Sequence, residues 1–283
     1  MSFAIRPLIG ILATVLLAGP AFANNNASVT SSLVVQQPKK EGRLWSGYVN
    51  VSRSTSLVDF KDGSRKDGMD YSLRFNLKLN DKFTARIQGG YSQDLKYPET
   101  DDWSDTSLSV SRSPFEVGTH FLIGYRVGLT APTSKDSHTR QNLLTSVSSS
   151  LNVIVNPDRL ITGLDLSGSI SAARNIHQYE TALDGRVNTQ YSSNQTVSVS
   201  YSWESGASLS ADFMHRNTWS YQNVMRDSFE MSQELGYQFN PTWAVAVGHT
   251  NGGSTLRPNG SDSNVQIMDE NNSLVYGSMT VIF

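Results

Sequence analysis

The sequence predicts an all-β protein, a closed antiparallel up-and-down transmembrane β-barrel of about 12 strands. Three observations predict this fold. Apolar and polar residues alternate with period two along most of the chain, many of the alternating segments run about ten residues or longer, and short turns alternate with long polar loops. Membrane strands need about 9 to 11 residues, whereas soluble proteins usually use about five or six. The segment lengths therefore favour a membrane barrel over a soluble β-sandwich.

The first 23 residues have the pattern of a cleaved signal peptide. Arg6 precedes an apolar run over residues 8–17 that is too short for an ordinary transmembrane helix. The Ala-Phe-Ala sequence that ends at Ala23 places small residues where a signal peptidase reads them. We therefore expect an exported chain, in which residues 24–42 are a flexible periplasmic segment and residues 43–283 are the barrel.

Composition excludes several classes of protein. The chain contains no cysteine, which excludes a disulfide scaffold, a thiolate metal site and a lipoprotein anchor. Without Arg6, 22 basic residues stand against 25 acidic ones, a formal charge of −3 for the mature chain. That balance argues against nucleic acid as a partner. The sequence shows no phosphate-binding glycine loop, zinc motif or haem motif, so it predicts no cofactor.

Alternation is clearest in residues 71–79, 196–203, 208–213 and 229–237, where Gln233 is the one exception. Period two places alternate side chains on opposite faces of a strand. Twelve strands are expected, near residues 43–54, 69–80, 82–95, 104–113, 117–131, 142–156, 160–175, 186–203, 207–220, 228–239, 242–251 and 273–283. A turn at residues 192–194 would change the count, so 14 or 10 strands remain alternatives.

The connections predict which end of the barrel faces which side of the membrane. Short turns begin at Asn80, Asn156 and Asn240, and they alternate with longer polar loops. Those loops cover residues 58–67, 96–103, 133–141 and 251–272. Short periplasmic turns opposite long external loops are typical of membrane barrels. Aromatic residues near strand ends suit the two membrane interfaces, namely Trp45, Phe83, Tyr91, Trp203, Trp219 and Trp243.

The last predicted strand carries the most specific signal. It ends on Phe283, with Val281 and Met279 on the same face. This strand resembles the terminal strand of Gram-negative outer-membrane β-barrel proteins, which the barrel-assembly machinery of that membrane recognises. The resemblance covers the whole mature chain in pattern but only this strand in motif. It implies a location in the cell outer membrane, among outer-membrane lipid and lipopolysaccharide, and it identifies no particular family.

If the apolar face of each strand meets lipid, the other face lines the lumen. The charged residues predicted to line a pore are Arg74, Lys78, Arg86, His120, Arg126, Asp165, Asp212, Arg216, Glu230 and Glu234. Those of the first half are basic and those of the second half are mostly acidic. Opposed walls would create a transverse field across a wet lumen. The sequence thus favours a porin-like channel for small polar, hydrophilic solutes, although a lumen filled by paired Arg and Glu side chains remains open.

Two other functions remain as alternatives. The first is a non-conducting barrel whose extracellular loops bind a surface partner. The second is a surface hydrolase, because the sequence from His249 to Gly253 resembles the His-x-Ser-Asn motif of outer-membrane phospholipases and lipid A deacylases. Asn251 occupies the position of the nucleophilic serine, and Thr250 is expected on the opposite face. We therefore expect that the chain is not an enzyme.

Overall fold

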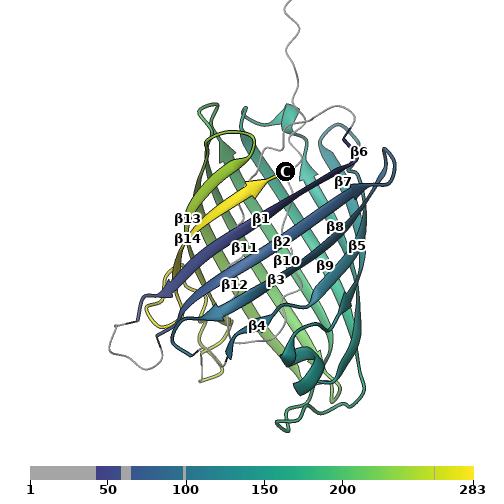
Figure 1. Ribbon diagram of the computed structural model, residues 1–283, viewed down its shortest axis with the longest axis vertical. Coiled ribbons are helices and arrows are strands. Elements are labelled where there is room, and N and C mark those ends of the chain that lie inside the picture. The colour runs from purple at the N-terminus through teal and green to yellow at the C-terminus, as the bar shows by residue number, and fades with distance from the viewer. Residues whose placement is uncertain (1–42, 59–64, 98–99, 258) are drawn as a thin grey trace, which may run out of the picture.

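The computed structural model describes residues 43–58, 65–97, 100–257 and 259–283. The predicted signal peptide and the segment 24–42 lie outside these residues. Within them the chain forms one closed antiparallel β-sheet whose strands are inclined to the long axis of the molecule (Figure 1). No helix among the described residues is long and apolar enough to cross a membrane.

Each long strand pairs with its neighbours in the chain, and β1 pairs with β14, which closes the barrel. The strands are β1 (Trp45–Ser56), β2 (Asp67–Lys78), β3 (Phe83–Asp94), β4 (Asp102–Trp103), β5 (Thr106–Arg112), β6 (Phe115–Val117), β7 (Phe121–Ala131), β8 (Leu143–Val155), β9 (Leu164–His177), β10 (Thr189–Ser202), β11 (Ala207–Ser220), β12 (Met225–Gln238), β13 (Trp243–Ser254) and β14 (Leu274–Ile282). The wall has 12 barrel strands, as predicted, because β4, β5 and β6 are successive pieces of one strand.

The interrupted strand β4–β5–β6 is predicted as one shorter segment, 104–113. β4 and β5 both pair with β3, and β5 and β6 both pair with β7. The register shifts by one residue on each side of β5, as Tyr91 pairs with Trp103 whereas Phe83 pairs with Arg112. Pro114, at the second interruption, has no N–H to give to the ladder, so the strand bulges there.

Strand β10 decides the strand count. Ser192, Ser193 and Asn194 pair without interruption with β9 on one side and with β11 on the other. The predicted alternative of a turn at these residues is therefore wrong, and so are the counts of 14 and 10. The long strand is favoured because both neighbouring strands satisfy its backbone groups along its length.

The short turns predicted at Asn80, Asn156 and Asn240 lie at one end of the barrel, where β14 also ends (Figure 1). Their asparagine side chains explain their shape. Asn80 Oδ1 accepts hydrogen bonds from the backbone N–H groups of Lys82 and Phe83, and Asn240 Oδ1 does the same for Thr242 and Trp243. The described parts of the predicted long loops lie at the opposite end. One connection there departs from the pattern, because only residues 221–224 join β11 to β12.

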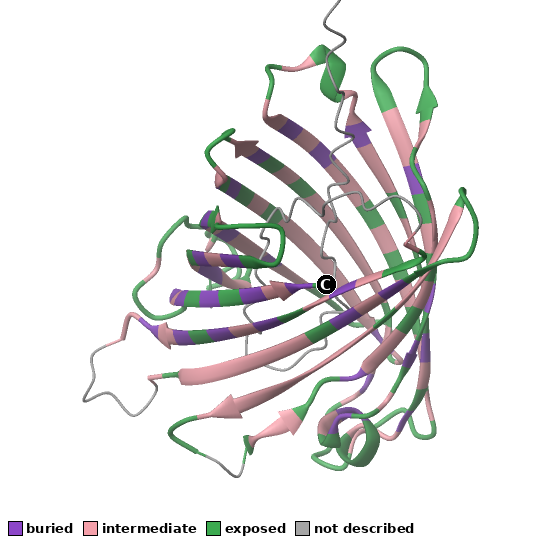
Figure 2. Cartoon of the chain, turned by 45° about the horizontal axis from the view of Figure 1, so that its top comes forward, coloured by how far each residue is buried: buried purple, intermediate pink, exposed green. Residues whose placement is uncertain are grey.

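The two faces of the sheet are inverted relative to a soluble protein. Outward side chains such as Leu73, Val127 and Val247 are 51%, 54% and 59% exposed, while inward ones such as Ser52 and Asn76 are buried. Figure 2 shows buried and exposed residues alternating along many of the strands. An apolar surface of this extent is typical of contact with lipid.

Aromatic side chains form girdles at both ends of this apolar band, as predicted. At the short-turn end, Trp45 stacks on Phe75 with ring centroids 5.9 Å apart, and Tyr201 meets Trp203 at 4.8 Å. At the long-loop end, Tyr91 contacts Trp103 at 5.1 Å.

The terminal residue Phe283 lies in the short-turn girdle. Its ring is 5.9 Å from that of Trp45, and its backbone exchanges hydrogen bonds with Gly47. Met279 is 45% exposed on the outward face, which it shares with Val281 by the alternation of β14.

Candidate functional site

Eight of the ten predicted pore-lining residues lie on the inward face of the barrel. Arg86, Arg126, Arg216 and Glu230 line a cavity inside the barrel. Arg74, Asp165 and Glu234 are buried at 2%, 4% and 3% exposure on the same inward face, and inward serines bond Asp212. Whether a solute passes them stays a prediction.

Two predicted residues lie elsewhere. Lys78 is at the end of β2, where its Nζ pairs with the Asp81 carboxylate of the following turn at 2.7 Å. His120 is exposed in the turn before β7, and its Nδ1 lies 2.9 Å from Thr119 Oγ1. His120 thus precedes β7, which begins at Phe121 after a reversal at Gly118 with φ of +65°, and its place at the lumen stays a prediction.

The basic wall consists of Arg74 on β2, Arg86 on β3 and Arg126 on β7. Arg74 Nε and Nη2 both donate to Gln88 Oε1, at 3.1 and 2.8 Å, and its guanidinium lies 5.1 Å from the centre of the Tyr48 ring. Arg86 Nε donates to Asn76 Oδ1 at 2.8 Å. Neutral amide oxygens therefore orient two of the three cations, and no carboxylate pairs with any of the three within 4 Å among the described residues.

The acidic wall lies across the lumen, on β11 and β12, because three strands separate these from the strands β2–β7 in each direction around the closed sheet. Asp212 accepts hydrogen bonds from Ser198 Oγ and, at 3.3 Å, from Ser232 Oγ. Glu234 accepts one from the Tyr276 hydroxyl at 2.7 Å. Arg216 is the basic exception on this side, and Glu230 attracts it electrostatically. The transverse separation of charge expected from the sequence is thus present in the structure.

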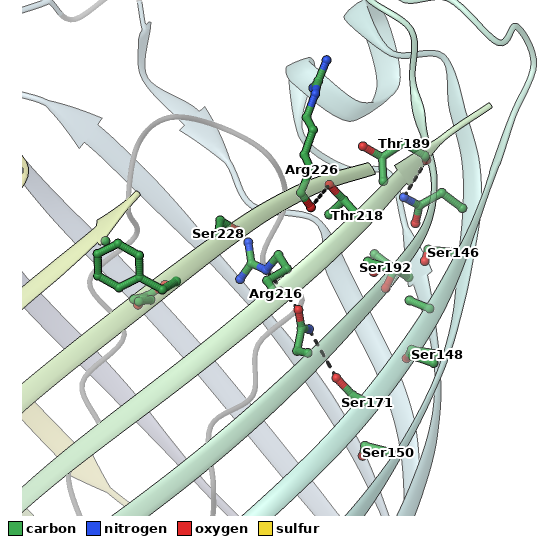
Figure 3. Close-up of a pocket in the computed structure, with 18 of the residues that line it drawn as sticks. Ser146, Ser148, Ser150, Ser171, Thr189, Ser192, Arg216, Thr218, Arg226 and Ser228 are labelled. Atoms are coloured by element: carbon green, nitrogen blue, oxygen red, sulfur yellow. Dashed lines mark hydrogen bonds between the residues drawn. The ribbon is translucent and has the colours of Figure 1, made fainter. Parts of the chain in front are cut away.

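Between the charged walls, small polar side chains line a cavity of about 960 Å³. Figure 3 shows Ser146, Ser148 and Ser150 following one another along β8, with Ser171 of β9 beside them. Ser171 Oγ accepts a hydrogen bond from Asn194 Nδ2 at 3.3 Å. Hydroxyl groups donate and accept equally well, so this surface suits solutes of either polarity.

The last external loop borders this cavity in part, because Thr255, Leu256 and Asn272 line it. Asn251 also lines the cavity, and its Nδ2 donates to the backbone oxygen of Gln266 at 2.7 Å, which joins this end of β13 to the loop.

The outward histidines bear on the hydrolase alternative. His249 Nδ1 lies 2.9 Å from Gln233 Oε1, which explains why Gln233 interrupts the apolar alternation of β12. On the same outward face His215 lies between Gln195 Oε1 at 2.8 Å and Asp227 Oδ1 at 2.5 Å. Within the described part of the chain, neither ring has a hydrogen bond with a hydroxyl group, so neither arrangement prepares a nucleophile. The His215–Asp227 pair was not predicted from the sequence. A polar residue at a position where alternation places lipid-facing side chains could have indicated it.

The sequence analysis also missed Tyr48 and Tyr276 as lumen residues. Both faces of β14 carry apolar side chains, with Leu274, Tyr276 and Ile282 buried on the inward side. Alternation is then too weak to separate the faces. Among the described residues, no group of three or more His, Asp or Glu side chains is placed to hold a metal ion.

Comparison with known proteins supports the fold. No protein-family model matches the sequence, and no curated protein matches it. Solved structures do. An outer membrane channel from Pseudomonas putida F1 is similar at 14% identity with a TM-score of 0.59, over 87% of this chain and 99% of that one. The NanC porin is similar at 10% identity and TM-score 0.52, over 84% and 98% of the two chains.

A third similar structure is a KdgM porin in complex with disordered oligogalacturonate, at 9% identity and TM-score 0.51, over 83% of this chain and 99% of that one. Identities this low establish the fold alone. Together with the closed antiparallel sheet, they show that this chain has the fold of a 12-stranded antiparallel β-barrel.

Proposed function

We propose that this chain forms a channel for small hydrophilic solutes in the cell outer membrane. The observation that supports it is the closed barrel around a cavity of about 960 Å³ with a wall rich in hydroxyl and amide groups. A solute that sheds hydration water on entry would find replacement hydrogen bonds along such a wall. The charged walls would orient any solute that carries a dipole.

Strand number alone does not decide between a packed and an open lumen. Twelve strands lie between the narrow barrels whose side chains fill the interior and the large porins with aqueous channels. Side-chain size favours the channel. The inward residues of β5 are all serines, Ser107, Ser109 and Ser111, and the cavity reaches each except Ser111. Small side chains leave the centre of this part of the lumen unfilled.

The membrane environment follows from the same proposal. The outward apolar band would contact outer-membrane lipid and lipopolysaccharide, with the long loops outside and the short turns in the periplasm. Delivery through a cleaved signal peptide and insertion by the barrel-assembly machinery are part of this proposal. The outward histidines have no hydroxyl partner, which supports transport over hydrolysis.

Single-channel recording in a planar bilayer tests the proposal directly. The refolded full chain should show steady openings, and Arg86→Gln or Glu230→Gln should change their size or ion selectivity because both side chains line the cavity. A silent bilayer, with folding verified by heat-modifiable gel mobility, would refute the channel. It would favour the non-conducting barrel that binds a surface partner through its external loops.

A further inference from the structure

We propose that Arg74, Arg86 and Arg126 form an oxyanion-binding site in the lumen wall, which takes a carboxylate or phosphate group of a small solute. This inference deepens the proposed channel function by naming its class of solute, and it rests on that function for its role in transport. Binding itself can be measured without transport.

Unused donor groups on the three guanidinium groups are the first observation. Arg74 is only 2% exposed, and its Nη1 has no hydrogen-bond acceptor among the residues that the structure describes, although Nε and Nη2 both donate to Gln88. Arg86 Nη1 and Arg126 Nε are likewise buried without an acceptor. Buried polar groups without partners are uncommon in native proteins, and each calls for an explanation. A ligand oxygen would supply the acceptors that the protein does not.

Uncompensated charge is the second observation. Each of Arg74, Arg86 and Arg126 is close enough to another of them for like-charge repulsion. Among the described residues, the one other ionisable group that acts on Arg74 and Arg86 is the Tyr48 hydroxyl, which is a weak acid. Cations gathered away from bulk water are costly unless a negative charge is near. A bound anion would offset this cost, which a neutral sugar would not do.

Space beside the arginines is the third observation. Strand β5 separates β3 from β7, and in register Arg86 faces Ser109 while Arg126 faces Ser111. Because serine is short, β5 leaves space on its inward face between the two longer side chains. Arg86 and Arg126 both line the cavity, together with Ser109, Ser148 and Ser150. The planar fork of a guanidinium matches two oxygens of a carboxylate or phosphate, and serine hydroxyls can donate to the same group.

The acidic wall would help to orient a bound anion toward the arginines. Asp212 and Glu230 lie on β11 and β12, across the barrel from the arginines, and each is near enough to the other for repulsion. An anionic group in the lumen would be repelled from that side and drawn to the arginine side. The binding geometry therefore has one defined direction.

Binding is tested by isothermal titration calorimetry on the refolded full chain, with succinate and with inorganic phosphate in separate titrations. We expect binding of at least one. Arg86→Gln and Arg126→Gln should each weaken it about tenfold or more, the loss that one charge-assisted hydrogen bond implies. Arg86→Lys should recover little, because an ammonium group keeps the charge and loses the fork. Arg140→Gln removes the same charge from an exposed loop side chain and should change nothing.

The two probes distinguish the two chemistries. Tighter binding of succinate identifies a carboxylate site, and tighter binding of phosphate identifies a phosphate site. Binding of neither by a chain whose folding is verified by gel mobility would overturn the inference, and so would variants that bind as tightly as the unaltered chain. Single-channel recording on the same samples separates the proposals. Channel openings without anion binding would support the channel and refute the oxyanion site. Anion binding without openings would support the site and refute the channel.

Discussion

The Tyr276 hydroxyl on β14 donates a hydrogen bond to Glu234 Oε2 on β12, at 2.7 Å, across the intervening strand β13. The residue of β13 that lies in register between them is Gly248. A Cβ atom there would be 2.4 Å from the Tyr276 hydroxyl, so the ring lies directly over the glycine. One side chain thus joins three strands near the point where the barrel closes.

Tyr276→Phe should lower the free energy of unfolding by about 1.5–3 kcal/mol, because it removes a hydrogen bond to a carboxylate inside the wall. Urea titration of the chain refolded in lipid vesicles measures the difference. Tyr179→Phe, on an exposed loop residue, serves as the control. Equal midpoints for Tyr276→Phe and the unaltered chain would contradict the role given to this bond.

Gly248→Ala should destabilise the barrel by about 1–3 kcal/mol, since the added methyl group must displace the Tyr276 ring. Gly277→Ala is a matched control, because a Cβ at that position meets no atom within 4 Å. The same vesicle titration compares them. If both substitutions had the same effect, contact with Tyr276 would not be the cause.

Phe283→Ala should reduce the amount of barrel inserted in cells while leaving refolding in detergent nearly intact. The terminal ring lies at the outer surface beside Trp45, 36% exposed, so few native contacts depend on it. Membrane fractionation and heat-modifiable gel mobility measure insertion and folding separately. Phe239→Ala, another exposed girdle residue, controls for the loss of an aromatic ring. Equal loss in cells and in detergent would indicate a packing role rather than an assembly signal.

Glu230→Gln should shift the ion selectivity of the channel toward anions, because it removes a negative charge from a residue that lines the cavity. The reversal potential under a salt gradient reports this shift. Glu204→Gln makes the same chemical change at an exposed position in the β10–β11 turn, and we expect no shift from it. An unchanged reversal potential for Glu230→Gln would place the ion path away from this wall.

We expect no lipid hydrolysis by the unaltered chain. His249→Ala should therefore leave the barrel folded and give the same result in a hydrolysis assay. The His249 ring contacts the Gln233 amide and no hydroxyl group. A phospholipid hydrolysis assay in mixed micelles compares the two proteins, with added calcium in a parallel series. If the unaltered chain hydrolysed phospholipid and His249→Ala lost that activity, the result would support the surface-hydrolase alternative.

The sequence by itself determined the fold class and the positions of most turns, and it favoured 12 strands over 14 or 10. Period two reports a strand with two different environments, and in a barrel that difference persists along every strand. Asn80 and Asn240 marked turns because their side chains bond the backbone two and three residues ahead, which is a local interaction. The bulges around β5 were not predicted, because they depend on pairing with β3 and β7.

Only the tertiary structure decided how the inward side chains combine. Alternation assigned Arg74, Arg86 and Arg126 to one face. It could not show that these cations are close enough to repel one another, or that two of them donate hydrogen bonds to neutral amide oxygens. It missed Tyr276, because β14 is apolar on both faces. These relationships arise from the register between strands and from closure of the barrel, which bring together residues distant in the chain. A period along one strand contains no information about either.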